Sequence, residues 1–407
     1  MLTRASGEPV VTELTPLTGL RGFAALWVLV YHVWVEATPR LMMLGPLDMT
    51  PLFSAGWAGV DIFFTLSAFL LSLPYASRLQ QGRPAPSPGR YWLRRIVRIF
   101  PAYYAQLLVL IALAGLFGIG VWPTMRQLVG NLLLLNNLGP FGAAPINPVT
   151  YTLPIEFGFY LLLPLLAPLL RPRRWPWLAL GAILVTQAWR QLVFPLVADA
   201  PVPVRVVALE QLPGRLDQFV AGMLAAFFYV RAVATGRPVH RGANELLMLS
   251  GLILFASLLW AGHYAIATYW EGHPLLFAWH GLAGLATAAM LHASARGSRL
   301  ARVLFDSRPL RWLGLVSFGV YLWHYPLMQW LDAAHAFDWI DGYRLPWMLP
   351  VVLAGACVLA WLSYRFVELP FLRLGGRPGD RPQVTTEMIS RRDGGAASAT
   401  PGDAPPP

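Results

Sequence analysis

Residues 21–32 read Arg-Gly-Phe-Ala-Ala-Leu-Trp-Val-Leu-Val-Tyr-His and lie inside an apolar run that extends from about Pro16 to about Ala37. This run is about 20 residues long, which is enough for a helix to cross a bilayer. Arg21 and His32 are eleven residues apart. At about 100° per residue they return to nearly the same face, about 16 Å apart along the axis. Ionisable side chains are costly in lipid, so this face is expected to line a cavity or to meet a partner.

The composition indicates the class of protein. Of the 407 residues, 56% are hydrophobic and 13% are charged, whereas a soluble domain has about 25% charged residues. We therefore expect an all-α polytopic membrane protein. The net charge of +11 does not indicate a nucleic-acid partner, because the basic residues fall in short loops between apolar segments. The single cysteine, Cys357, excludes a disulfide framework and a cysteine-based metal site.

About ten transmembrane helices are predicted, surrounding a central cavity. Their approximate bounds are 16–37, 52–76, 98–121, 149–170, 175–196, 213–232, 244–267, 273–294, 309–331 and 347–370. Residues 125–138 are apolar but too few for a span, so they predict an interfacial or re-entrant helix.

The loop charges predict the orientation of the chain. Arginine is concentrated in alternate loops, and the positive-inside rule then places both termini in the cytoplasm. We divide the chain into a cytoplasmic N-terminal segment, 1–15, a transmembrane domain, 16–374, and a cytoplasmic tail, 375–407. The tail is rich in Gly, Pro, Ala and Arg, which predicts disorder.

Two carboxylates fall inside predicted membrane helices and each requires a partner. Asp61 lies near the outer end of the second helix, and we expect it either to pair with Arg215 or to orient His32. Glu156 lies near the outer end of the fourth helix, at about the predicted depth of His32, where a carboxylate sets the tautomer of an imidazole. Alternatively, Glu156 is only an interfacial group and Glu36 is the partner of His32.

The densest basic cluster lies in residues 90–104, which read RYWLRRIVRIFPAYY. Arg94, Arg95 and Arg98 are spaced so that they share one face of a helix. Guanidinium groups bind phosphate oxygens in a bidentate manner. The same arginines also suit anchoring to anionic lipid headgroups, and the residues alone leave both interpretations open.

The last two predicted helices also carry polar side chains. The ninth contains SFGVYLWHYP, in which Tyr321 and His324 are three residues apart and share a face. The tenth ends with LSYRFVELPF, in which Arg365 and Glu368 are expected to form a pair at the inner surface.

Taken in order, these segments resemble the membrane-bound acyltransferase-3 family, the bacterial O-acyltransferases of cell-surface sugars. The resemblance covers residue 10 to about residue 375. It rests on the Arg and His of the first helix and on GVDIFFTLSAFLLS, RRIVRIFPAYY, TLPIE, SFGVYLWHYP and LSYRFVELPF. Three residues depart from the family pattern. Ala68 replaces a usual Gly, and Tyr151 and Pro154 lie where Trp-Ser-Leu-Ser is usual. These departures affect the acceptor-binding part of the expected site more than the donor-binding part.

The resemblance implies an enzyme that transfers an acyl group, by default acetyl, from a CoA thioester to a hydroxyl of a carbohydrate or glycolipid acceptor. The resemblance implies His32 as the catalytic base, Arg21 as a functional residue and Glu156 as a supporting acid. Asp61 is a further catalytic candidate, because it could hold His32 in place. The resemblance implies Arg95 and Arg98 as donor-binding residues, and Arg94 is a further candidate on the same helix face. The expected substrate-binding residues are Tyr321, His324 and Arg215. No metal is expected.

The implied location is the cytoplasmic membrane of a bacterium, with membrane lipid as a further partner. The short tail predicts the form of the family without its additional hydrolase-like domain. Direct transfer and transfer through an acyl-enzyme both remain open. The alternative function is a transporter or flippase for an anionic or glycolipid substrate, although the inverted repeats typical of such proteins are not visible.

Overall fold

The computed structural model describes residues 14–37, 42–136, 138 and 143–374. Thr15–Gly375 form one compact unit. The predicted tail, 375–407, and nearly all of the predicted N-terminal segment, 1–15, lie outside the described residues.

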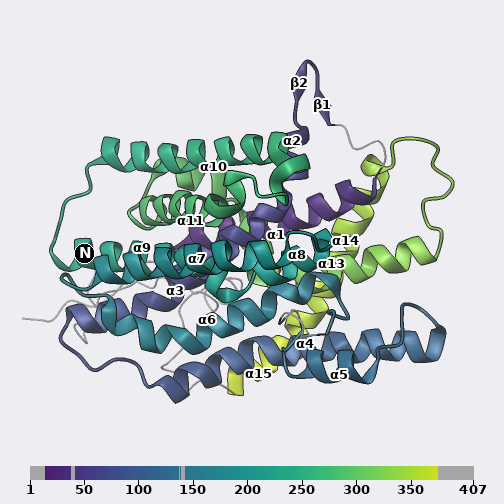
Figure 1. The fold of residues 1–407 in the computed structure, drawn as a ribbon, viewed down its shortest axis with the longest axis horizontal. Coiled ribbons are helices and arrows are strands. Elements are labelled where there is room, and N and C mark those ends of the chain that lie inside the picture. Colours follow the sequence, from purple (N-terminus) through teal and green to yellow (C-terminus); the bar gives the residue numbers. More distant parts are fainter. Residues whose placement is uncertain (1–13, 38–41, 137, 139–142, 375–407) are drawn as a thin grey trace, which may run out of the picture. The chain divides into compact units, whose positions relative to one another are not determined.

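Long helices dominate the described chain (Figure 1). Nine of its segments, some of them extended by a short helical turn, are long and apolar enough to cross a membrane. The α-helices of these segments are α1 (Thr15–Glu36), α3 (Gly59–Gln80), α4 (Pro88–Phe117), α6 (Thr152–Leu166), α7 (Trp175–Val197), α9 (Leu216–Ala234), α10 (Arg241–Tyr269), α11 (Pro274–Ala295) and α14 (Leu345–Ser363). The prediction of an all-α polytopic membrane protein is confirmed.

The remaining predicted span, 309–331, is also a helix, α13 (Arg308–Ala333), but it is not among these nine. It carries His324 within its central turns and two arginines in its first turn. A helix packed on several sides by other helices can carry more polar residues than a helix that faces lipid. Because of α13, the count of ten spans stays a prediction.

Helix α1 packs along α13 and also touches α3 and α14. Glycines allow the backbones of α1 and α13 to approach each other closely. A methyl group on Gly22 would lie 2.0 Å from the carbonyl oxygen of Leu310, and one on Gly314 would lie 1.9 Å from that of Thr18. Small residues at helix contacts are typical of membrane bundles, where packing replaces the hydrophobic effect as the cause of association.

Shorter elements connect the long helices. They are β1 (Met43–Leu44), β2 (Leu47–Asp48), α2 (Thr50–Ser54), η1 (Gly56–Ala58), α5 (Met125–Leu132), η3 (Pro148–Tyr151), η4 (Ala167–Leu169), α8 (Val202–Leu209), η5 (Leu212–Arg215), α12 (Arg299–Phe305), the π-helical turn η6 (Tyr364–Glu368) and α15 (Leu369–Leu374). The strands β1 and β2 form a small antiparallel hairpin. Helix α5 is shorter than the predicted 125–138 and starts at a capping box made by Thr124 and Gln127.

Helix α4 begins at Pro88, ten residues before the predicted span 98–121. A proline in the first turn favours this start, because the first helical N–H groups have no partner within the helix. The helix ends at Phe117. The residue that follows it, Gly118, has a left-handed φ of +67°, which glycine adopts at little cost. The basic cluster therefore lies on the first turns of a continuous helix.

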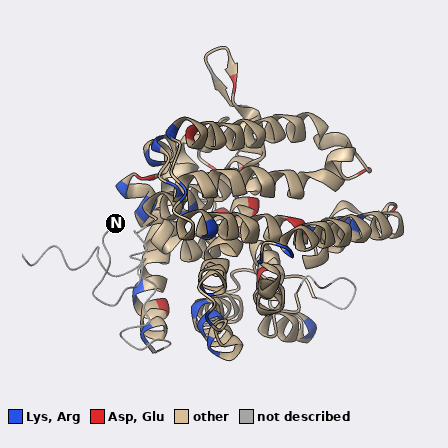
Figure 2. Cartoon of the chain, turned by 90° about the vertical axis from the view of Figure 1, so that its left-hand side faces the viewer, with Lys and Arg blue, Asp and Glu red and all other residues tan. Residues whose placement is uncertain are grey.

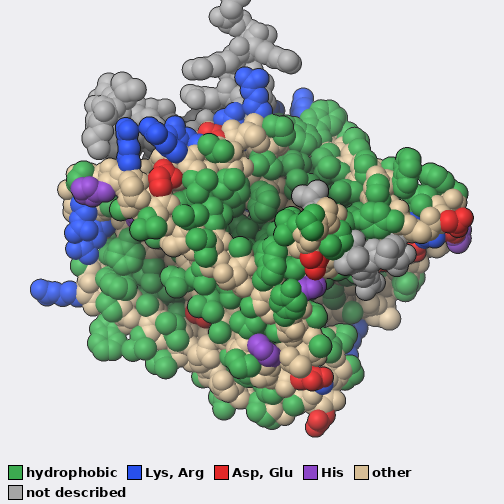
Figure 3. Space-filling model, turned by 90° about the horizontal axis from the view of Figure 1, so that it is seen from above, with side chains coloured by type: hydrophobic (Ala, Val, Ile, Leu, Met, Phe, Trp, Pro, Cys, Tyr) green, Lys and Arg blue, Asp and Glu red, His purple; other side chains and the backbone are tan. Residues whose placement is uncertain are grey.

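The surface matches a membrane environment. Hydrophobic side chains cover much of the face seen in Figure 3, and Leu108, Leu116 and Leu165 are 69%, 76% and 70% exposed. Most of the arginines lie towards one end of the helices, on the left in Figure 2. The exposed apolar surface and the nine long apolar segments show a multi-pass membrane protein, and its orientation stays a prediction.

Candidate active site

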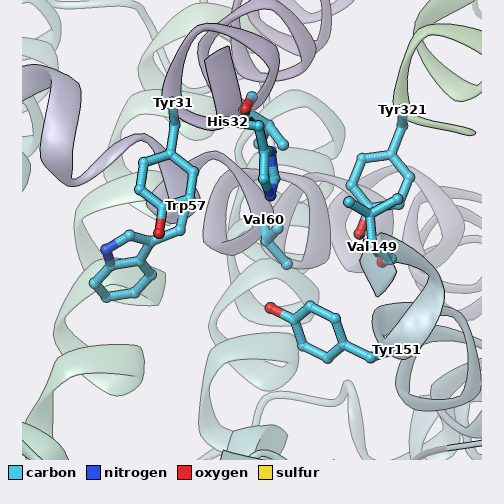
Figure 4. Close-up of a pocket in the computed structure, with 8 residues that line it drawn as sticks. Tyr31, His32, Trp57, Val60, Val149, Tyr151 and Tyr321 are labelled. Carbon is cyan, nitrogen blue, oxygen red and sulfur yellow. Dashed lines mark hydrogen bonds between the residues drawn. The ribbon is translucent and has the colours of Figure 1, made fainter. Parts of the chain in front are cut away.

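His32 lies at a cavity of about 190 Å³ (Figure 4). The lining residues come from α1, η1, α3, η3 and α13 and are Val28, Tyr31, His32, Trp57, Val60, Val149, Tyr151 and Tyr321. Figure 4 shows the imidazole of His32 and the hydroxyl of Tyr151 facing the same space. Aromatic walls around one imidazole are typical of a small-molecule site.

The Nδ1 atom of His32 lies 2.9 Å from the carbonyl oxygen of Val28, one turn earlier on α1. A carbonyl oxygen only accepts, so in the neutral ring Nδ1 carries the hydrogen and Nε2 keeps its lone pair. The same Nδ1 lies 3.2 Å from Nε2 of His324. Among the described residues no carboxylate forms a hydrogen bond with His32, and Glu36 is exposed.

Tyr321 lines the cavity, but its hydroxyl is already occupied. It donates to the carbonyl oxygen of Val149 at 2.5 Å and lies 2.8 Å from the hydroxyl of Thr152. Its role in the structure is thus to tie η3 to α13. His324 is fully buried and does not line the cavity, because its ring is directed towards His32.

Glu156 belongs to a second centre, around Arg21. Its Oε1 accepts hydrogen bonds from the hydroxyl of Ser67, at 2.8 Å, and from Tyr160. Arg21 interacts electrostatically with Glu156, Arg98 and Glu368. Glu156 therefore lies within electrostatic range of Arg21, and among the described residues no hydrogen bond joins Glu156 to His32. The reason is local, since Tyr151 occupies the cavity and Glu156 lies more than a helical turn further along the chain.

The basic cluster on α4 adjoins this second centre. Nη1 of Arg98 donates to Oε2 of Glu368 at 2.9 Å. The predicted pairing of Glu368 with Arg365 is wrong. The π-helical turn η6 widens the helix there, and the guanidinium of Arg365 lies over the ring of Phe366 instead. Arg95 lies over the ring of Tyr91, with 5.9 Å between its guanidinium carbon and the ring centroid.

Four buried polar atoms on α3 and α4 have no hydrogen-bond partner among the described residues. They are Nε of Arg95, the hydroxyls of Tyr75 and Tyr91, and Oγ of Ser72. The rings of Tyr75 and Tyr91 are 5.8 Å apart, so these donors lie in one region. Buried polar groups without a partner are rare in proteins, and several together indicate a place where a ligand or water binds.

Asp61 pairs with Arg215, which confirms one of the two expected partners. Nη1 of Arg215 lies 3.1 Å from Oδ1 of Asp61, and both side chains are buried. Asp61 also accepts from Gln218 at 2.7 Å and from Trp279 at 3.0 Å. Asp61 is therefore fully occupied within the helix bundle and does not reach His32.

The sequence analysis did not identify the rest of this buried ionic cluster, which we define as Asp61, Arg190, Glu210, Arg215 and His280. His280 lies between the two carboxylates, 2.7 Å from Asp61 and 3.0 Å from Glu210. Arg190 lies 3.3 Å from Glu210. The signal available was a set of polar residues inside apolar helices, but nothing in the sequence links those positions.

Within the described parts of the chain, no group of three or more His, Cys, Asp and Glu side chains is placed to hold a metal ion.

Comparison with known proteins gives the family. The acyltransferase domain of the acyltransferase 3 family matches residues 16–365, which include α1, the basic cluster and α13. The chain belongs to this family. The matched region is an acyltransferase domain that covers most of the chain. No solved structure matches the chain.

Three relatives illustrate the range of the family. The chain is 29% identical to acyltransferase MdmB of Streptomyces mycarofaciens, with 93% of this chain and 96% of MdmB covered. It is 24% identical to the peptidoglycan O-acetyltransferase OatA of Listeria monocytogenes, with 88% and 56% covered. It is 23% identical to the O-acetyltransferase OatA of Staphylococcus aureus, with 89% and 58% covered. The chain thus spans a little over half the length of the two OatA proteins.

Proposed function

We propose that this protein transfers an acyl group, by default acetyl, from a CoA thioester to a hydroxyl group of a cell-surface carbohydrate. The observation that carries the proposal is the arrangement along α1. His32 lies at an aromatic cavity with Nε2 free to accept a proton. Arg21, on the same helix face, lies within electrostatic range of Arg98 in the basic cluster. The relative from Listeria monocytogenes is named a peptidoglycan O-acetyltransferase, which supports a carbohydrate acceptor.

The basic cluster suits the phosphates of CoA. Arg95 and Arg98 are on neighbouring turns of α4, and the unpartnered donors of Tyr75, Tyr91 and Arg95 offer hydrogen bonds to anionic oxygens. The pantetheine arm of CoA separates its phosphates from its thioester. This matches a site in which Arg21 and the base are about 16 Å apart along one helix. The donor enters from the cytoplasm in this proposal, and the acceptor binds on the other side of His32.

The reaction requires one proton carrier. The acceptor hydroxyl gives its proton to Nε2 of His32 while its oxygen attacks the thioester carbon. The carbon–sulfur bond then breaks, and the leaving thiolate takes the proton from His32, which restores the neutral ring. General base catalysis of this kind contributes about 10² to 10⁴ in rate. This route is direct and requires no acyl-enzyme.

The cavity suits a sugar ring. Tyr31, Trp57 and Tyr151 provide aromatic faces and polar edges around His32, and such side chains combine apolar contact with hydrogen bonding. We place the protein in the cytoplasmic membrane of a bacterium, where cytoplasmic acyl-CoA and an extracytoplasmic glycan meet on opposite sides of one bundle. Family membership favours this function over transport.

The test is binding of CoA and acetyl-CoA to the detergent-purified protein, followed by transfer of labelled acetyl to soluble peptidoglycan fragments. Arg98→Ala should weaken CoA binding about tenfold or more, because a charge-assisted contact to phosphate is lost. His32→Ala should bind CoA normally and transfer nothing. Arg173→Ala is the control, because it removes an exposed arginine from the connection between η4 and α7. Absence of saturable CoA binding to the wild type would overturn the proposal.

A further inference from the structure

The two rings His32 and His324 lie on α1 and α13, 292 positions apart in sequence, with Nδ1 and Nε2 separated by 3.2 Å and ring centroids by 5.0 Å. We infer that His324 is a positioning residue for the base: its Nε2 accepts the Nδ1 hydrogen of His32. His324 takes the place that a carboxylate occupies beside many catalytic histidines. The inference rests on the proposed function, in which His32 is the base.

The hydrogen positions follow from the two backbone contacts. Nδ1 of His324 lies 2.9 Å from the carbonyl oxygen of Val320 and must donate to it. Nε2 of neutral His324 then has only a lone pair, and it faces Nδ1 of His32. That Nδ1 carries a hydrogen because it also faces the carbonyl oxygen of Val28. The hydrogen is shared between two acceptors, and both rings are fixed in one tautomer.

Packing holds this arrangement in place. His324 is 0% exposed, so its ring has no water with which to exchange this contact. Tyr31 and Tyr325 contact the ring of His32 edge-on, with centroids 5.0 Å and 5.4 Å away. Rotation of His32 about its side-chain bonds is therefore blocked on several sides, and Nε2 is directed towards the cavity.

A neutral acceptor has a specific chemical consequence. When His32 takes the acceptor's proton at Nε2, it becomes a cation, and its Nδ1 hydrogen bond to His324 becomes charge-assisted and stronger. The contact therefore favours the protonated ring, which exists during the reaction, more than the resting ring. Differential stabilisation of this kind raises kcat rather than the affinity for substrate.

The matched pair of variants is His324→Gln and His324→Asn. The glutamine side-chain oxygen can reach the position of Nε2 and accept from His32, whereas the shorter asparagine reaches only the position of Nδ1, near Val320. We expect His324→Gln to keep most of the wild-type kcat. His324→Asn should lower kcat about 10- to 100-fold, as loss of an outer-shell partner typically does, with the KM for acetyl-CoA unchanged.

A spectroscopic readout separates positioning from simple stability. ¹⁵N NMR of histidine-labelled protein, with His32 assigned by difference from His32→Gln, should show a single Nδ1–H tautomer in the wild type and in His324→Gln. His324→Asn should show a mixture. His263→Gln is the control, because His263 forms its hydrogen bond with Ser54 and not with His32.

The outcomes distinguish this inference from the proposed function. Equal kcat values for the Gln and Asn variants, with an unchanged His32 tautomer, would overturn the role of His324 while His32→Ala remains inactive. An increase in the KM for the acceptor with kcat unchanged would also overturn it, since His324 would then contact the acceptor. Full activity of His32→Ala would instead overturn the proposed function itself.

Discussion

Arg98 and Glu368 are joined by a hydrogen-bonded ion pair of 2.9 Å, although 270 positions separate them in sequence. The pair connects the first turns of α4 with the π-helical turn η6. Arg98 is 21% exposed at its side chain, whereas that of Glu368 is only 1% exposed. The second carboxylate oxygen of Glu368 is buried without a partner among the described residues. A buried negative charge thus lies beside the proposed phosphate site.

This geometry predicts that Glu368→Gln binds CoA more tightly than the wild type. The change removes a negative charge that competes with the donor phosphates for Arg98. The free energy of CoA binding should therefore improve by about 1 kcal/mol, or about fivefold in affinity. Calorimetric titration with CoA measures it, and Glu36→Gln is the control for loss of a carboxylate elsewhere. Weaker binding by Glu368→Gln would mean that Glu368 orients Arg98 for the donor.

The unpartnered hydroxyl of Tyr91 predicts two effects of opposite sign. Tyr91→Phe removes a buried polar group that lacks a partner, so the melting temperature of the donor-free protein should rise, by the equivalent of about 1 kcal/mol. The same change should weaken CoA binding several-fold. Tyr103→Phe is the matched control on α4, because the Tyr103 hydroxyl donates to the carbonyl oxygen of Asn131 at 2.9 Å.

Tyr103→Phe should therefore destabilise the protein and leave CoA affinity unchanged. If both variants lowered the melting temperature and neither changed CoA binding, the hydroxyl of Tyr91 would be structural and the donor would bind elsewhere.

The buried ionic cluster predicts a large cost for removing one of its charges. Asp61→Asn leaves Arg215 and His280 without one of their carboxylates, and breaking a buried pair typically costs about 3–5 kcal/mol. Thermal unfolding in detergent should show a strongly lowered midpoint. CoA binding by the fraction that remains folded should equal that of the wild type, because this cluster lies apart from the basic cluster on α4. A normal midpoint would show that the pair contributes little.

Tyr151 predicts a defect confined to the acceptor. Its hydroxyl faces the cavity and forms no hydrogen bond with any described residue. Tyr151→Phe should lower kcat/KM for the acceptor about tenfold, the loss expected when one hydrogen bond to substrate is removed. The KM for acetyl-CoA should not change. Tyr264→Phe, which removes an exposed hydroxyl on α10, is the control. An equal loss for donor and acceptor would contradict this assignment.

Much of the fold follows from the sequence because apolar run length is a strong signal in lipid. The runs predicted the long helices, and the arginine spacing predicted a shared face on α4. The Asp61–Arg215 pair was one of the two partners expected for Asp61, since buried charges of opposite sign in neighbouring helices satisfy each other. These features depend on composition and local periodicity, which a single sequence contains.

Other features depend on contacts between distant segments. The partner of His32 was expected to be a carboxylate, and the structure provides His324, because glycine contacts bring α13 against α1. The Arg365–Glu368 pair was predicted from ordinary helical spacing, but a π-helical turn changes the direction of Glu368. Neither helix register across an interface nor a π-turn leaves a clear local pattern in the sequence.

The glycine contacts between α1 and α13 have a mechanical consequence. The carbonyl oxygens of Leu310 and Thr18 occupy the positions that methyl groups on Gly22 and Gly314 would need, so the two helices cannot slide past each other without a backbone clash. These contacts hold α13 closely against α1, and this packing places the two imidazoles 3.2 Å apart, Nδ1 to Nε2. We therefore expect movement that admits a bulky acceptor to come from another part of the cavity wall, the short turn η3, which the hydroxyl of Tyr321 joins to α13.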